Sequence, residues 1–97
     1  MANRLSEIQI IPIKPQNGLV AFASFVLDRS LYLGSIGIMT RPNGGYRLVY
    51  PTKKVANRNL NIFYPISREF ALVIEQEVIK QFEEVMNKYD RHHRFNP

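Results

Sequence analysis

The residues best suited to chemistry in this chain are cations that gather in its middle. The stretch carries the side chains Arg41, Arg47, Lys53, Lys54 and Arg58, and tyrosines lie close by in sequence at Tyr46, Tyr50 and Tyr64. Cationic side chains contact phosphates, and exposed tyrosine rings stack on nucleobases. The combination predicts a binding site for a polyanion such as nucleic acid. A solvated loop with core-packed tyrosines is the alternative interpretation of the same residues.

Asparagines add amide groups to the same stretch of sequence. They are Asn43, Asn57, Asn59 and Asn61. An asparagine amide can read the edge of a base, but asparagine is also a frequent turn residue. Both interpretations remain open at the level of sequence.

A second, smaller basic cluster follows the predicted helix near the C-terminus. Its members are Arg91, His92, His93 and Arg94. We include Arg91 and Arg94 among the candidate nucleic-acid contacts, although the helix dipole alone favours cations at this place. Adjacent histidines point in different directions, so they are poor joint metal ligands and we expect no metal site.

No residue pattern predicts catalysis. The chain has no cysteine, which excludes a disulfide scaffold, a thiolate metal site and a cysteine nucleophile. The segment from Gly34 to Gly37, GSIG, matches no phosphate-binding loop, dinucleotide motif or nucleophile elbow. Asp28 lies in a predicted hairpin loop without a nearby histidine, which is typical of a turn-stabilising aspartate. We therefore expect no enzyme, no cofactor and no small-molecule substrate.

Charge is divided along the chain, which has a net charge of +5. Residues 1–67 hold eight basic and two acidic residues, and no acid occurs between Asp28 and Glu69. Residues 68–90 hold six acids and three bases. A long stretch with one sign of charge makes a positive surface wherever it folds, so we expect the cations of this acid-free middle to share one outward surface.

The predicted secondary structure that positions these residues changes from strands to a helix near residue 67. Period-two alternation predicts strands within residues 5–64, at 5–13, 19–27, 31–40, 46–50 and 60–64, with a polar basic loop over 51–59. Ser67 is a candidate helix N-cap, and Glu69 falls in the first turn. Apolar residues then recur three or four positions apart, as Phe70, Ile74, Val78, Phe82, Val85 and Tyr89.

These signals predict one α+β domain over residues 1–97. It has an antiparallel sheet of about five strands, one long helix over about 68–89 and a short basic tail over 90–97. The absence of a long apolar run and of a signal-peptide core predicts a cytoplasmic protein with no membrane span. A chain of 97 residues buries only about 60–70% of its unfolded surface, so a dimer is a plausible source of further burial.

Several short motifs resemble those of the SpoVG family of bacterial sporulation and septation regulators. Residues 21–28 read AFASFVLD, like the family's AxASxxLD, and Asn43-Gly44 stands before a strand. Residues 49–54 read VYPTKK, like a segment that ends in proline, serine and two bases. Residues 64–66 read YPI where the family has HPI, and a long helix follows. Order and spacing agree over residues 5–88.

The resemblance implies an α+β fold, a homodimer and a gene-regulatory protein that binds DNA and, in some members, RNA. Lys53 and Lys54 match the family's basic pair. The following segment, VANRN at 55–59, lacks the acid and the glycine that are usual there. Thr52 and Tyr64 replace the usual serine and histidine. The departures make this segment more basic.

Three hypotheses of function follow, and a dimeric nucleic-acid-binding regulator leads them. The second is a protein–protein interaction module that uses the helix or an edge strand, without direct nucleic-acid binding. The third and weakest is a small enzyme, because no acid–base constellation is present.

Overall fold

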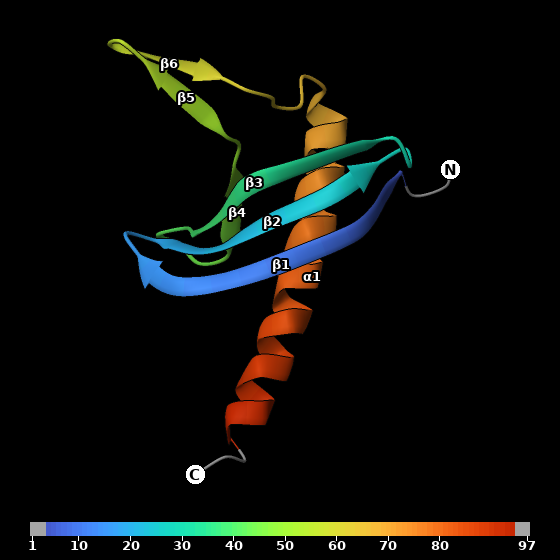
Figure 1. The fold of residues 1–97 in the computed structure, drawn as a ribbon. Coiled ribbons are helices and arrows are strands. Elements are labelled where there is room, and N and C mark those ends of the chain that lie inside the picture. The colour runs from blue at the N-terminus through green and yellow to red at the C-terminus, as the bar shows by residue number, and fades with distance from the viewer. Residues whose placement is uncertain (1–3, 95–97) are drawn as a thin grey trace.

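A computed structural model describes residues 4–94, with side chains described for residues 4–88. Six strands precede one helix, and the elements are β1 (Leu5–Gln16), β2 (Leu19–Leu27), β3 (Leu31–Thr40), β4 (Tyr46–Val49), β5 (Thr52–Val55), β6 (Arg58–Asn61) and α1 (Arg68–Arg94). Figure 1 shows a sheet of β1 to β4 crossing one side of α1, with the β5–β6 hairpin projecting away from both. The predicted α+β class with an antiparallel sheet and one C-terminal helix is confirmed.

The main sheet is an antiparallel meander with the strand order β1-β2-β3-β4. Its register shifts at Glu7 in β1 and around Ser35 in β3, and both residues have positive φ. Such bulges bend a strand and increase its twist. A Cβ at Gly37 would lie 2.9 Å from Leu19 Cδ1, so this glycine leaves room for the Leu19 side chain over β3.

The core lies between one face of this sheet and α1. It contains Leu5 of β1, Ala21, Ala23 and Phe25 of β2, Ile36 and Ile38 of β3, and Ile74, Val78 and Phe82 of α1. The Tyr46 ring on β4 meets the Phe82 ring edge-on, with centroids 4.9 Å apart. Ile74, Val78 and Phe82 of the predicted helical stripe therefore pack on the sheet, with Phe70 packed against them, whereas the side chain of Tyr89 lies outside the described residues.

The helix begins as its sequence predicts and continues further than predicted. The Ser67 hydroxyl accepts a hydrogen bond of 3.1 Å from the Phe70 backbone N–H, as an N-cap does. The helix runs to Arg94, so the prediction of a separate tail from residue 90 was wrong over residues 90–94. No glycine or proline interrupts these residues, and the next proline is Pro97. Residues 95–97 lie outside the described part of the chain.

The structure has two sheets in place of the predicted single sheet of about five strands. The segment predicted as a polar loop, 51–59, instead forms β5, a two-residue turn and the start of β6. Ala56 opens the turn with a φ of 57°, and Val55 pairs with Arg58 across it. The result is a separate two-stranded sheet beside a four-stranded one.

The outer face of the main sheet, opposite α1, is apolar and open. Ile11 pairs with Phe22, and Phe22 pairs with Gly37, which pairs in turn with Val49. Ile11 is 62% exposed, and Phe22 and Val49 are each 36% exposed. Apolar residues lie on both faces of β2, but within the described chain only the face toward α1 is covered. No helix in the described part is long and apolar enough to cross a bilayer.

Candidate nucleic-acid interface

The β5–β6 hairpin carries three of the predicted cations on an exposed two-stranded ribbon. Every residue of both strands is exposed. The register pairs Thr52 with Asn61, Lys53 with Leu60, Lys54 with Asn59, and Val55 with Arg58. Paired residues share a face and successive residues alternate between faces, so the hairpin has two distinct sides.

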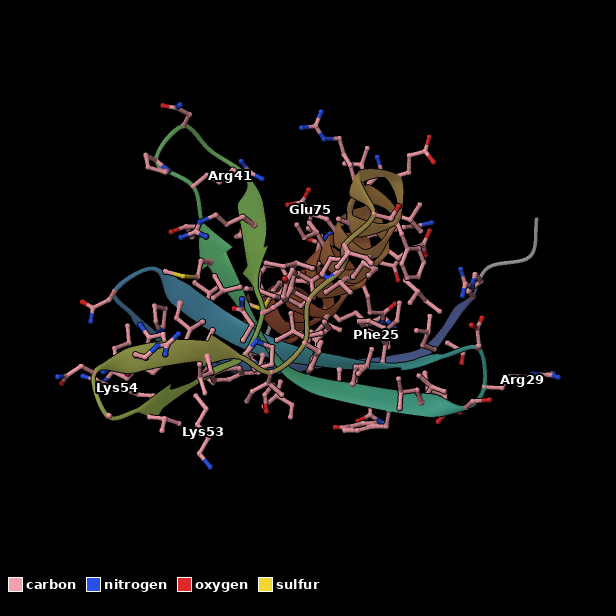
Figure 2. The ribbon with its side chains drawn as sticks, turned by 90° about the horizontal axis from the view of Figure 1, so that it is seen from above. Phe25, Arg29, Arg41, Lys53, Lys54 and Glu75 are labelled. Carbon is pink, nitrogen blue, oxygen red and sulfur yellow. The ribbon has the colours of Figure 1, made fainter. Side chains whose placement is uncertain are left out.

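We name these sides by their chemistry. The amide face consists of Thr52, Lys54, Asn59 and Asn61, and the mixed face consists of Lys53, Val55, Arg58 and Leu60. Figure 2 shows Lys53 and Lys54 pointing in different directions, both away from the body of the molecule. The hairpin can therefore present cations on both of its sides.

The hairpin cations are not engaged by carboxylates of the described chain. The ion pairs seen among residues 4–88 join Arg4 to Asp28 and Arg41 to Glu75. The stretch between Asp28 and Glu69 contains no acidic residue, and the whole hairpin lies within it. Lys53, Lys54 and Arg58 are thus free to meet an external anion.

Arg41, another predicted contact, is held by its own chain. Its Nε donates to the Tyr46 carbonyl at 2.9 Å, and its Nη2 donates to Glu75 Oε2 at 3.1 Å. These bonds fasten the turn between β3 and β4 to α1, and Figure 2 shows Arg41 beside Glu75, apart from Lys53 and Lys54. The structure does not bring Arg41 together with the hairpin cations.

The remaining cations of the acid-free middle are spread over the molecule. Arg47 is exposed on β4, with its Nη2 3.9 Å from Met39 Sδ on β3. Arg29 lies in the turn between β2 and β3, at the opposite end from the hairpin (Figure 2). The expectation of a single surface for all of these cations was therefore wrong. Arg29 and Arg41 lie away from the hairpin, and within the hairpin Lys54 lies on the opposite face from Lys53 and Arg58. The side chains of Arg91 and Arg94 lie outside the described residues.

Asp28 is a structural aspartate, as its sequence context predicts. Its carboxylate accepts hydrogen bonds from Arg4 Nε at 2.9 Å and from Arg4 Nη2 at 2.7 Å. These hydrogen bonds hold the pKa of Asp28 below its usual range. The Arg4 guanidinium also lies 5.0 Å from the centroid of the Phe70 ring. The pair fastens the start of β1 to the turn after β2.

The three tyrosines near the cations have different environments. Tyr46 packs on Phe82, and Tyr50 packs edge-on against Phe63 with centroids 6.0 Å apart. The Tyr50 hydroxyl is buried without a hydrogen-bond partner among the described residues, and burial, with a smaller effect of Glu75, raises the pKa of Tyr50 to about 12. Only Tyr64, which is 53% exposed, keeps a ring available for stacking within this set.

The asparagines separate in the same way. Asn43 and Asn57 lie in turns, whereas Asn59 and Asn61 stand on β6 on the same face as Lys54. The sequence identifies all four as candidates but not which of them share a surface. Their two-residue spacing becomes informative only once residues 58–61 are known to be a strand.

The model of the SpoVG family matches residues 4–84, which agrees with the family motifs found in the sequence. The chain belongs to the SpoVG family. A curated relative from Treponema denticola (strain ATCC 35405), named "Putative septation protein SpoVG", is 26% identical over 80 residues. That match covers 81% of this chain and 85% of the relative. The match to the SpoVG family model extends over the whole sheet, the hairpin and the first two-thirds of α1.

Proposed function

We propose that this SpoVG protein is a cytoplasmic, dimeric nucleic-acid-binding regulator of the septation and sporulation type. The observation that carries the proposal is the projecting β5–β6 hairpin, whose Lys53, Lys54 and Arg58 are exposed and have no carboxylate partner in the described chain. Membership of the SpoVG family and the septation name of its relative support the biological context.

Phosphate attraction follows from the placement of charge. Lysine and arginine that reach phosphates release condensed counterions, which drives binding and makes it depend on salt. Glutamates line the exposed side of α1, including Glu83 and Glu84, and they repel a polyanion from that side. The hairpin is therefore the part of the chain that meets nucleic acid first.

The test is a salt titration of binding to random-sequence duplex DNA, measured by fluorescence anisotropy. Exchanging both Lys53 and Lys54 for Ala should weaken binding to all sequences alike and make the slope of log affinity against log salt shallower by about two. Arg29→Ala is the matched control, because it removes one exposed cation at the other end of the sheet and should leave the slope nearly unchanged. Equal effects of the two variants would remove the hairpin from the interface.

The dimer that we propose requires apolar surface, and the outer sheet face offers it. Ile11, Phe22 and Val49 are exposed and lie in one row across the sheet, with the buried Gly37 between Phe22 and Val49. A second copy of the chain on this face would lie beside the base of the hairpin, because Thr52 lines one hollow together with Phe22, Gly37 and Val49. Two hairpins then double the cationic surface offered to one duplex.

A protein-interaction module is the alternative, and the edge of the sheet favours it. β4 is an edge strand, and a hollow of about 360 Å³ beside it is lined by Leu48, Tyr50, Leu72 and Glu75 among others. An extended peptide could add to this edge and place side chains in the hollow. Retention of a protein partner after nuclease treatment, together with no affinity for DNA or RNA, would favour this function over the first.

A further inference from the structure

The amide face of the hairpin carries hydrogen-bonding groups that the fold does not use. Lys54, Asn59 and Asn61 are exposed, and none of their side chains forms a hydrogen bond within residues 4–88. Thr52 adds a hydroxyl at the base of the same face. Four adjacent polar side chains on a flat surface are thus available to one external ligand.

The shape of the hairpin limits what that ligand can be. Two paired strands lie about 4.8 Å apart and four residues extend about 13 Å, so the ribbon is narrow and short. The major groove of B-form DNA is about 12 Å wide and admits a two-stranded ribbon, whereas the minor groove is about 6 Å wide. The projection of β5 and β6 beyond the sheet and α1 leaves the ribbon free to enter a groove (Figure 1).

The spacing of the two asparagines matches the spacing of bases. Asn59 and Asn61 are two residues apart on one face of β6, which corresponds to about 6.8 Å along the strand. Stacked base pairs are about 3.4 Å apart, so the two amides are separated by about two base-pair steps. An asparagine amide pairs with N6 and N7 of adenine, and a lysine ammonium reaches O6 and N7 of guanine.

From these observations we propose that the amide face enters the major groove of duplex DNA and reads base sequence. Asn59 and Asn61 contact two adenines about two base-pair steps apart, and Lys54, opposite Asn59, contacts a neighbouring guanine. Lys53 and Arg58 lie on the opposite, mixed face of the ribbon, so Lys54 is the hairpin cation on the face that enters the groove. The inference rests on the proposed nucleic-acid binding and adds to it the groove, the bases and the residues that read them.

Duplex RNA does not fit the same geometry. Its A-form major groove is deep and narrow, and side chains cannot read the bases there. A single strand offers no groove to hold the ribbon. A preference for duplex DNA over duplex RNA of the same sequence is therefore a direct consequence of the proposal.

The experiment selects preferred sites for the full chain from a library of random-sequence duplex DNA. The selected site is then made with 7-deaza-adenine, which lacks the N7 acceptor in the major groove, in place of each adenine. We expect roughly tenfold weaker binding when the adenines at the two predicted positions are replaced and no change elsewhere in the site. The same site made as an RNA duplex should bind at least as weakly as unselected DNA.

Variants assign the positions to residues. Asn59→Ala and Asn61→Ala should each abolish the base preference at one position, two steps apart, while affinity for unselected DNA stays within about twofold. Asn59→Asp keeps the side-chain shape and should shift the preference from adenine toward cytosine, because a carboxylate accepts from cytosine N4. Asn43→Ala, an exposed asparagine of the turn between β3 and β4, is the matched control and should leave every preference intact.

The outcomes separate this inference from the function on which it rests. Binding to duplex DNA that is insensitive to 7-deaza-adenine and to both asparagine variants would overturn the inference and leave the proposed function standing. Tighter binding to duplex RNA or to single strands would do the same. No binding to any of these nucleic acids would overturn both.

Discussion

At the scale of single residues, the hydroxyl of Tyr50 lies in an environment that does not satisfy its hydrogen-bonding capacity. Its hydroxyl is buried, has no partner in the described chain and lies near Glu75. A buried hydroxyl without a hydrogen bond costs free energy that an apolar ring does not. We expect Tyr50→Phe to raise the free energy of unfolding by about 1 kcal/mol at neutral pH, measured by urea denaturation. A loss of stability would show that the hydroxyl is hydrogen-bonded in solution.

The pH dependence supplies the control for Tyr50. Its pKa is raised to about 12, so the neutral form is the one that the folded chain favours. This contribution to stability is fully present below the pKa of an unfolded tyrosine, near 10, and is lost as the pH rises toward 12. The decline in unfolding free energy over this window should be smaller in the Tyr50→Phe variant.

The cations also show how partners decide the role of a residue. Arg41 and Lys54 are similar in sequence terms, since both lie in a basic stretch beside turn residues. Arg41 is bonded to Tyr46 and Glu75, whereas Lys54 stands free on the hairpin. The distinction depends on a glutamate 34 positions further along the chain, so no local pattern could predict it.

At the scale of elements, the turn of the hairpin holds an avoidable strain. Ala56 has a φ of 57°, a region that costs a residue with a Cβ about 1 kcal/mol and costs glycine little. We expect Ala56→Gly to stabilise the hairpin locally and to slow amide hydrogen exchange in β5 and β6. Because the hairpin projects from the rest of the fold, the global free energy of unfolding should change much less (Figure 1).

A glycine in a regular element is the control for this variant. Ala71→Gly in the first turns of α1 should lower the global free energy of unfolding by about 1 kcal/mol, because glycine is a poor helix former. Faster exchange in the hairpin of the Ala56→Gly variant would show that the turn adopts another conformation in solution.

The elements differ in how far the sequence predicts them, and the reason is the strength of their local signal. The helix start, the apolar stripe from Phe70 to Phe82 and the bounds of β2 follow from caps and periodicity, and the structure confirms them. The hairpin was predicted as a loop because its residues are polar and its turn, Ala56-Asn57, lacks the glycine that usually marks a two-residue turn. The sequence therefore identified residues of the candidate site but did not predict the hairpin surface on which they lie.

At the scale of the whole molecule, the fold presents three kinds of surface. α1 covers one face of the sheet and exposes acids such as Glu83 and Glu84 on its far side. The outer face is largely apolar, with Arg47 exposed on β4, and the cationic hairpin projects from the sheet. An antiparallel sheet with one free face usually places polar residues there. The apolar row through Ile11, Phe22 and Val49 is thus the part of the surface that most needs a cover.

A dimer through this face makes the last prediction. In a two-fold contact the same patch meets itself, so Ile11→Glu places a new carboxylate from each copy into the contact. We expect the variant to be monomeric by size exclusion with light scattering at concentrations where the unaltered chain is dimeric, with its circular dichroism unchanged because Ile11 is 62% exposed. Its salt slope for duplex DNA should fall to about half, since one hairpin then binds where two did.

The control adds the same charge outside the row. Ile66 precedes α1 and is 91% exposed, so Ile66→Glu should remain dimeric and keep the full salt slope. A dimer that survives Ile11→Glu and dissociates with Ile66→Glu would move the contact to the segment before α1. If the unaltered chain is monomeric at every concentration, the apolar row has a different occupant, and a single hairpin must supply all of the phosphate contacts. The ratio of the two salt slopes therefore reports directly on how many hairpins one duplex engages.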